Sequence, residues 1–328
     1  MSVLAGMCYG FYSAFISVGM NKGIWSEWKG VNTLLSEFAV IYIVGALGAT
    51  LNDLISAVWA WIIIIKKKKS RNFFECIRSK EGKILFAAAI GGPIAGIAYI
   101  IAFQLAGFLV IPITALTPAT GALLGKIILK QELNKRKIFG VIVCVFAGLL
   151  IGMSSINGTA GNNLILGLII AFIAAFGWGL EGIVAGYSTT FIDYEIGITV
   201  RQTISGIFNL FILLPVLSFF NGSMTATLQM AVQAVTDTSS VIFFIINGFF
   251  TLFAFSLWYK GNSICGAALG MACNASSFWG PFFCWIVIRV IMGEEGWLLS
   301  PEVWIGAVIM VIGIGFIALN SIDLFKKS

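Results

Sequence analysis

A carboxylate and several aromatic side chains have the spacing expected of a site for a positively charged organic group. Trp178 and Glu181 are three residues apart, as are Tyr9 and Tyr12, so each pair shares a face if its segment is helical. An aromatic face attracts a cation by roughly 0.5 to 2 kcal/mol without a directional hydrogen bond. The alternative is that the rings fill the protein interior and that Glu181 pairs with Arg201 or a backbone donor.

The chain contains no histidine, which excludes several kinds of site. A Ser-His-Asp or Cys-His nucleophile needs an imidazole, and so does a histidine-ligated metal. The six cysteines include no Cys-x-x-Cys pair, and most lie in apolar stretches where a thiol acts as a small packing residue. The sequence therefore predicts that the protein is not an enzyme and that it has no metal or cofactor.

The composition predicts a protein that lies in lipid. Hydrophobic residues make up 59% of the 328 residues and charged residues only 10%, whereas a soluble domain is about 25% charged. Apolar runs of about 20 residues are typical of membrane-spanning helices. Ten such spans are predicted, at 2–20, 36–65, 84–104, 108–129, 137–154, 164–188, 197–220, 240–260, 267–291 and 302–321.

Basic residues predict the orientation of these spans. Eight lysines and arginines lie between positions 66 and 83, four between 130 and 137, and two near the C-terminus, whereas the opposite connections hold only Lys22 and Lys29. The positive-inside rule places the basic connections in the cytoplasm, together with both termini. The net charge of +6 is thus a topology signal, and no nucleic-acid partner is expected.

Asp53 is a second carboxylate within an apolar run. It precedes the Lys66 boundary by about 18 Å of helix, which places it near the middle of the bilayer. An ionisable group there is costly unless it is paired or faces water. Asp53 and Glu181 are therefore candidates for carrying a proton as a coupling ion, and the alternative for Asp53 is a structural role beside Asn52, Lys126 or another polar group.

The third, fourth, eighth and ninth predicted spans should supply the remaining walls of the site. Their candidate binding residues are Tyr99, Trp258, Tyr259, Asn274 and Trp279, with Gln104, Thr117, Asn247 and Ser277 as further polar positions. The alternative is that these polar groups join helices by hydrogen bonds worth about 0.6 kcal/mol each.

Three segments recur in the same order, about 160 to 170 residues apart. Residues 10–13 align with 179–182, Tyr99 aligns with Trp258, and the segment that follows Glu132 aligns with the one that follows Glu294 or Glu295. The alignment divides the chain into a first five-helix repeat at 1–155 and a second at 156–328. Since each repeat has an odd number of spans, the two must be inverted relative to each other.

A family resemblance lies at the end of the first repeat. Residues 116–133 read LTPATGALLGKIILKQEL and are followed by Ile138-Phe139-Gly140. This stretch resembles the EamA repeat of the drug/metabolite transporter superfamily, in which a helix ends in an acidic residue, a basic turn follows, and the next helix opens with Ile-x-Gly. The likeness covers essentially the whole chain through two copies, although the second carries the insertion GWLLSP before Glu302.

A second resemblance is to the branch of this superfamily that includes bacterial choline transporters. It rests on GWGLEG at 177–182, on Asp193-Tyr194-Glu195 and Arg201-Gln202, and on NDLISAVW at 52–59. The family resemblance implies an all-α membrane protein of ten transmembrane helices in two inverted repeats, with cytoplasmic termini and alternating access to one central cavity.

We therefore expect a secondary active or potential-driven transporter of a small organic solute, with a choline-like cation as the first candidate. No nucleotide-binding motif is present. The alternatives are an exporter or exchanger of a neutral or zwitterionic metabolite, such as an amino acid or nucleobase, and a channel or membrane scaffold. The expected partners are the solute, membrane lipid and protons as a candidate coupling ion, with the protein a monomer or homodimer in a bacterial inner or plasma membrane.

Overall fold

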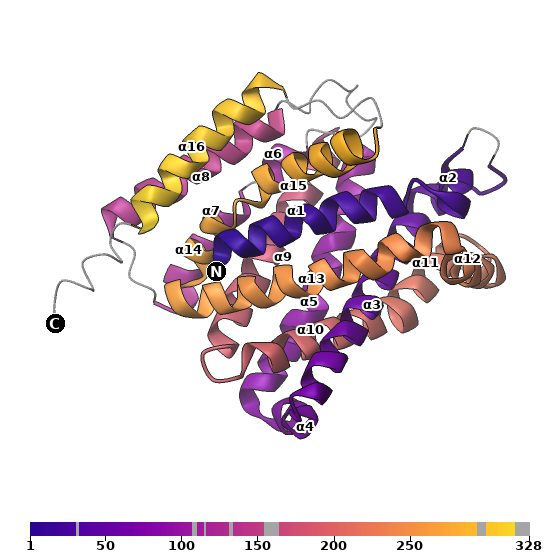
Figure 1. The fold of residues 1–328 in the computed structure, drawn as a ribbon, viewed down its shortest axis with the longest axis horizontal. Helices are drawn as coiled ribbons and strands as arrows, with labels where there is room; N and C mark the ends of the chain where they lie inside the picture. The colour runs from indigo at the N-terminus through magenta and orange to yellow at the C-terminus, as the bar shows by residue number, and fades with distance from the viewer. Residues whose placement is uncertain are drawn as a thin grey trace.

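The protein is built of helices, as the composition predicts. The computed structural model describes residues 1–30, 33–106, 110–114, 116–130, 134–153, 164–293 and 300–318, and these residues contain helices and no strand (Figure 1). Helices satisfy every backbone polar group within one segment, which lipid requires because it offers no hydrogen-bond partner.

Six helices of the described chain are long and apolar enough to cross a membrane by length and composition, and they indicate a membrane-embedded protein. Each coincides with one of the predicted spans. They are α1 (Ser2–Gly19), a π-helical segment (Ala39–Ile43) continued by α3 (Val44–Lys66), α5 (Lys80–Ala106), α9 (Leu164–Ser188), α10 (Tyr194–Phe208) continued through a π-helical segment (Asn209–Leu213) into α11 (Leu214–Phe220), and α13 (Thr238–Cys265).

The other four predicted spans fall on helices outside this set of six. Two of them are α8 (Lys135–Met153) and α16 (Pro301–Ala318). The fourth predicted span is divided into α6 (Val110–Thr114) and α7 (Thr117–Ile128). The ninth is divided into α14 (Ala267–Asn274), α15 (Ser276–Cys284) and a π-helical segment (Trp285–Ile291). The break between α14 and α15 is Ala275, whose φ of 51° lies in the left-handed region.

Three further helices lie in the connections between spans, where the apolar pattern gives no signal. They are α2 (Gly23–Lys29), α4 (Ser70–Arg78) and α12 (Met224–Thr236). The α4 helix is held by Phe73, a buried side chain whose ring centroid lies 4.6 Å from that of Trp61.

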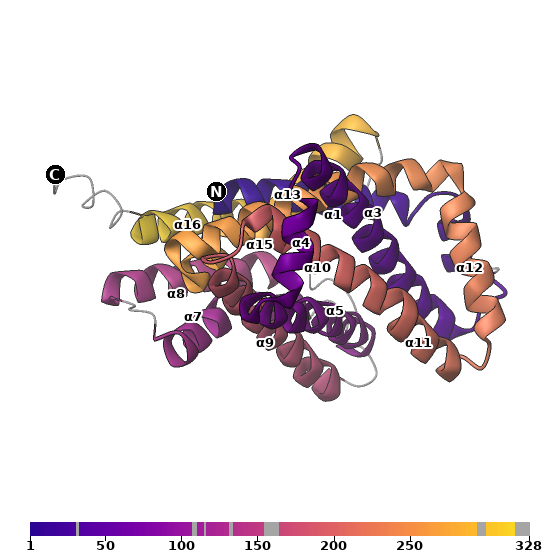
Figure 2. The same cartoon turned by 90° about the horizontal axis from the view of Figure 1, so that it is seen from below.

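Helices from the two halves of the chain pack against each other. The α1 helix lies beside α13, α5 packs against α9, and α8 and α16 form a pair at one edge of the bundle (Figure 1). Figure 2 shows this pair at one end of the molecule and α12 at the other. The two halves thus interleave in one bundle.

Asp237 joins two helices at the end of the molecule that carries α2 and α12. Its Oδ2 accepts a hydrogen bond of 3.1 Å from the Ile24 N–H at the start of α2, and its Oδ1 accepts one of 3.2 Å from the Ser239 N–H at the start of α13. One carboxylate therefore caps two helix N-termini. Partial burial raises the pKa of Asp237, but hydrogen bonds from Ser239, Ser240 and Ile24 outweigh it and the net pKa is lowered.

Asp237→Ala is expected to lower the free energy of unfolding by about 1 to 2 kcal/mol, since two helix ends lose their cap. A carboxyl with a lowered folded pKa stabilises the protein above its unfolded pKa and loses that effect as the pH falls through the folded pKa. The melting temperature in detergent should thus differ between wild type and variant at pH 7 and converge at acidic pH. A difference that stays constant with pH would contradict this assignment.

Candidate functional site

Three charged side chains meet inside the bundle: Asp53 on α3, Glu181 on α9 and Arg201 on α10. They are 7%, 2% and 5% exposed, respectively. Arg201 Nε lies 3.0 Å from Glu181 Oε1, and Arg201 Nη1 lies 3.6 Å from Asp53 Oδ1. The ion pair of Glu181 with Arg201 is the alternative to a binding role that the sequence left open. One guanidinium thus lies between two carboxylates.

A polar stripe on α10 and on the π-helical segment that continues it positions Asp53. Arg201, Ser205 and Asn209 are four residues apart, so they line one face of the helix. The Ser205 hydroxyl donates a short hydrogen bond to Asp53 Oδ2, and Asn209 Nδ2 donates to the same oxygen at 3.4 Å. Asn52 Nδ2 donates to Asp53 Oδ1 at 3.1 Å. Both oxygens of Asp53 therefore have hydrogen-bond donors.

Neutral side chains extend this network to α13. Asn52 Oδ1 accepts hydrogen bonds of 2.7 Å from Asn247 Nδ2 and from Thr251 Oγ1. Gln202 Oε1 accepts one of 2.7 Å from Arg201 Nη1, and Gln202 Nε2 donates to Ser56 Oγ at 2.8 Å. These hydrogen bonds fix the relative positions of α3, α10 and α13, although Asn247 Oδ1 and Asn209 Oδ1 are buried without a partner among the described residues.

Glu181 is less completely satisfied than Asp53. Its Oε1 accepts from Arg201 and, at 3.2 Å, from the Tyr259 hydroxyl. Its Oε2 is buried and has no hydrogen-bond partner among the described residues. This oxygen faces Gly92 of α5, where a Cβ would lie only 2.4 Å from it.

The three charged groups do not balance. With both carboxylates ionised and Arg201 protonated, the network carries a net charge of −1. Within the described part of the chain, the charged groups that act most strongly on Asp53 and Arg201 are those of the network itself. A net charge away from water is costly. The network therefore favours one additional positive charge.

Four aromatic rings lie around this network. The ring centroids of Tyr9 and Tyr12 on α1 are 5.2 Å apart, and those of Tyr99 on α5 and Trp178 on α9 are 5.5 Å apart. Tyr12 is close enough to interact electrostatically with Tyr99 and with the network residues Asp53 and Arg201. All four rings are partly exposed. The structure thus brings together rings that the sequence assigns to three different spans, beside Asp53 from a fourth.

Open space lies beside these rings on α5. Gly92, Gly96 and Tyr99 share one face of this helix. No atom lies within 4 Å of where a Cβ of Gly96 would be. The space at Gly96 is therefore bounded along α5 by the contact of Gly92 with Glu181 and by the Tyr99 ring.

Of the other predicted binding residues, one joins the charged network and three have contacts elsewhere. Tyr259 joins the network through Glu181. Trp258 instead packs in an apolar cluster, beside Phe255 and Tyr259. Asn274 and Trp279 lie against α1 where Gly6 and Gly10 allow close approach. Trp258, Asn274 and Trp279 are thus in contact with residues outside the charged network.

From the sequence, Arg201 is a partner for Glu181 and, with Gln202, part of a family resemblance, but Gln202, Ser205, Asn209 and Ser56 are not assigned to the site. A signal for Ser205 and Asn209 was present, since they follow Arg201 at four-residue spacing, and polar residues at that spacing in an apolar segment mark an inward face. The partner of that face could not be read from either helix alone.

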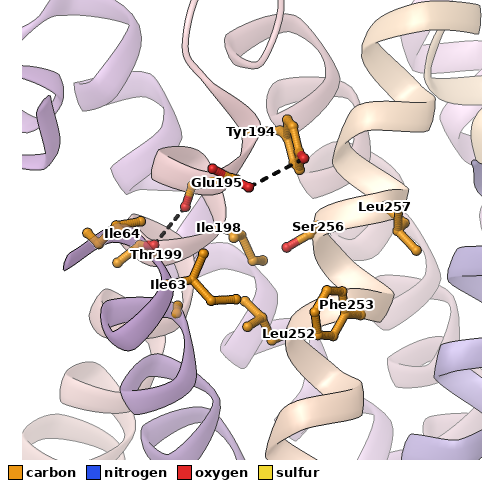
Figure 3. Close-up of a pocket in the computed structure, with 11 residues that line it drawn as sticks. Ile63, Ile64, Tyr194, Glu195, Ile198, Thr199, Leu252, Phe253, Ser256 and Leu257 are labelled. Carbon is orange, nitrogen blue, oxygen red and sulfur yellow. Dashed lines mark hydrogen bonds between the residues drawn. The ribbon is translucent and has the colours of Figure 1, made fainter. Parts of the chain in front are cut away.

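A separate small cavity of about 80 Å³ lies between α3, α10 and α13 (Figure 3). Its walls are mostly apolar, and none of the predicted site residues lines it. Those labelled in Figure 3 are Ile63, Ile64, Tyr194, Glu195, Ile198, Thr199, Leu252, Phe253, Ser256 and Leu257. The cavity therefore lies apart from the charged network.

Ion pairs join the end of α3 to the start of α10 beside this cavity. Lys69 Nζ lies 2.8 Å from both Asp193 Oδ2 and Glu195 Oε2, and Lys67 pairs with Glu195. Hydrogen bonds to the two carboxylates raise the pKa of Lys69. At the far end of the same two spans, before the π-helical segment that leads into α3 and after α11, Ser36 Oγ donates a neutral hydrogen bond of 2.6 Å to Asn221 Oδ1.

Comparison with known proteins identifies a shared fold. No protein-family model and no curated protein matches the chain. One solved crystal structure superposes with a TM-score of 0.65, covering 100% of this chain and 99% of its own, at 14% sequence identity. At that identity the likeness concerns the fold alone, so this chain has the same arrangement of helices as a protein already solved.

Proposed function

We propose that the protein is a secondary transporter that moves a small organic cation by alternating access. The observation that carries this proposal is the network of Asp53, Glu181 and Arg201, with its unbalanced charge of −1 beside four aromatic rings and the open space at Gly96. A cation in that space would balance the charge and contact the ring faces.

A cation fits this site better than a zwitterion or an anion. A solute carboxylate would need a free positive group, but Arg201 is already engaged by two carboxylates and by Gln202. The face of its guanidinium is also covered, since the Phe255 ring centroid lies 4.0 Å from it.

The proposed architecture is ten spans in two inverted repeats, as in the EamA family, with both termini cytoplasmic. Helix packing supports it. In the proposed repeat, α1 corresponds to α9, α3 to α10, α5 to α13 and α8 to α16. Under this correspondence the α1–α13 contact becomes the α9–α5 contact, and the α3–α13 contact becomes the α10–α5 contact. All four contacts are present. The α8–α16 pair converts into itself.

The interrupted helices also support the repeat. The turn at Leu116 before α7 and the break at Ala275 are separated by the offset of about 160 residues that relates the other repeated segments. Each broken helix contacts the first helix of the opposite repeat: α14 meets α1 at Gly6, and α7 meets α9 at Gly179. Discontinuous helices at corresponding positions are typical of transporter binding sites.

The binding test uses melting temperatures of the detergent-purified protein with quaternary amines, amino acids and nucleobases, since a ligand that binds the folded form raises the melting temperature. We expect the amines to do so. Stabilisation by a neutral solute alone would contradict a cation substrate. Saturable uptake in liposomes that contain only this protein would distinguish a transporter from a scaffold or open channel.

Tyr12→Leu is expected to weaken tetramethylammonium binding by about 2- to 30-fold, the equivalent of roughly 0.5 to 2 kcal/mol. Tyr12→Phe keeps the ring and should retain most of the affinity. Tyr187→Leu is the matched control, because Tyr187 lies on the same bundle but is 38% exposed on its outside. Equal affinities in all three variants would exclude Tyr12 from the site.

A further inference from the structure

The α12 helix connects two of the long apolar helices and is too short to cross a membrane itself. It has 13 residues and is about 20 Å long, whereas the hydrocarbon core of a bilayer is about 30 Å thick. Figure 1 shows it nearly end-on, and Figure 2 shows it lying across the direction of α1 at one end of the molecule. We infer that α12 lies in the membrane surface and binds the acyl chains of the lipid leaflet on the side away from Lys67 and Lys69.

Three faces of α12 have different surroundings. The face buried against the bundle consists of Thr227, Met230 and Ala234. A second face, the apolar strip, is 53% to 64% exposed and consists of Met224, Leu228, Val232 and Val235. The third face, the polar strip, is also exposed and consists of Thr225, Gln229, Gln233 and Thr236. Because the members of each strip are three or four residues apart, each strip runs along one side of the helix.

An outer surface divided lengthwise in this way matches a boundary between hydrocarbon and water. In water alone, the apolar strip would remain exposed over the length of the helix. In hydrocarbon alone, the amides of Gln229 and Gln233 would lose the hydrogen bonds that water supplies. A helix that lies in the boundary turns its apolar strip to the acyl chains and its polar strip to water.

The neighbouring surfaces favour lipid as the occupant of the apolar strip. Phe219 and Phe220, at the end of the span before α12, are 80% and 69% exposed, and Ile242 in the span after it is 49% exposed. Asn221–Ser223 alone separate α11 from α12, and Asp237 alone separates α12 from α13. Such short connections hold α12 at the level where the two spans end, so the apolar strip continues their exposed apolar surface.

The contact of α12 with lipid is uncharged. No Asp, Glu, Lys or Arg occurs between Arg201 and Asp237. Interfacial helices that select anionic lipids carry lysines or arginines on their polar face. We therefore expect α12 to bind lipid through the acyl chains, with no preference for the charge of the headgroup.

The first test labels the wild-type protein in phosphatidylcholine vesicles with a phospholipid that carries a diazirine on its acyl chain, and maps the labelled residues by mass spectrometry. We expect labels on Leu228 and Val232, with Phe219 as the positive control, and none on Gln229. Adding phosphatidylglycerol should leave this pattern unchanged. If Phe219 alone were labelled, water or a second copy of the chain would cover the apolar strip, and the inference would be overturned.

The second test places the same charge on adjacent exposed positions of α12. In phosphatidylcholine nanodiscs, Leu228→Glu should lower the melting temperature by several degrees, because a carboxylate replaces a side chain that contacts lipid. Gln229→Glu is the matched control and should melt like wild type, because position 229 faces water. Leu228→Gln, a milder change without charge, should give a smaller loss in the same direction. Equal melting temperatures for the Leu228 variants and the control would place both positions in water and contradict the inference.

Discussion

Arg201→Gln is expected to lower the free energy of unfolding by about 3 to 5 kcal/mol, the cost of removing one partner from a buried ion pair. The substitution leaves Asp53 and Glu181 ionised, buried and without a positive charge. Intrinsic tryptophan fluorescence during heating in detergent measures this loss of stability.

Two further variants separate charge from packing at this position. Arg201→Lys keeps the charge but offers one ammonium group in place of two separated donors, so we expect an intermediate loss of stability. Arg201→Gln combined with Glu181→Gln leaves Asp53 as the sole charge and should recover part of the loss. A single Arg201→Gln variant that melts like wild type at pH 7 would show that the network does not hold the bundle together.

Gly6→Ala is expected to destabilise the protein through a collision between backbones. A Cβ on Gly6 would lie 1.7 Å from the Asn274 carbonyl oxygen and 2.6 Å from Trp279 Cδ1. Because the nearer atom is backbone, α1 and α14 must separate, and overpacking of this kind costs about 1 to 3 kcal/mol. This cost exceeds the helix propensity gained by replacing glycine with alanine, about 1 kcal/mol.

Gly91→Ala is the matched control for this prediction. It also lies within a helix, α5, but no atom lies within 4 Å of its Cβ position. Its melting temperature should stay the same or rise, because only the propensity changes. If the two alanine variants melted at the same temperature, the close approach of α1 to the interrupted ninth span would be wrong.

Hydrophobicity accounts for the part of the fold that the sequence predicts. The six long helices follow from apolar runs, since an apolar segment of that length in lipid has no alternative to a helix. The α2 and α12 helices were not predicted because they are short or amphipathic and lie between spans. Their positions depend on contacts such as the double cap of Asp237, which joins segments more than 200 residues apart.

In the candidate site, too, some residues could be predicted from the sequence and some contacts could not. Glu181, Asp53 and the aromatic pairs could be found from residue type and helical spacing. The bond between Asp53 and Ser205 could not, because it depends on the rotation of α3 relative to α10. The unpartnered oxygen of Glu181 was equally inaccessible, since it results from the close approach of α5 at Gly92.

The two ends of the α3–α10 pair respond differently to electrolyte. The pairs of Lys67 and Lys69 with Asp193 and Glu195 are partly exposed, and dissolved ions screen such pairs over a Debye length of about 8 Å at 0.15 M. The hydrogen bond of Ser36 with Asn221 joins neutral groups and is insensitive to salt. Concentrated salt on the lysine side alone is therefore expected to weaken the contacts at that end and to leave the opposite hydrogen bond unchanged.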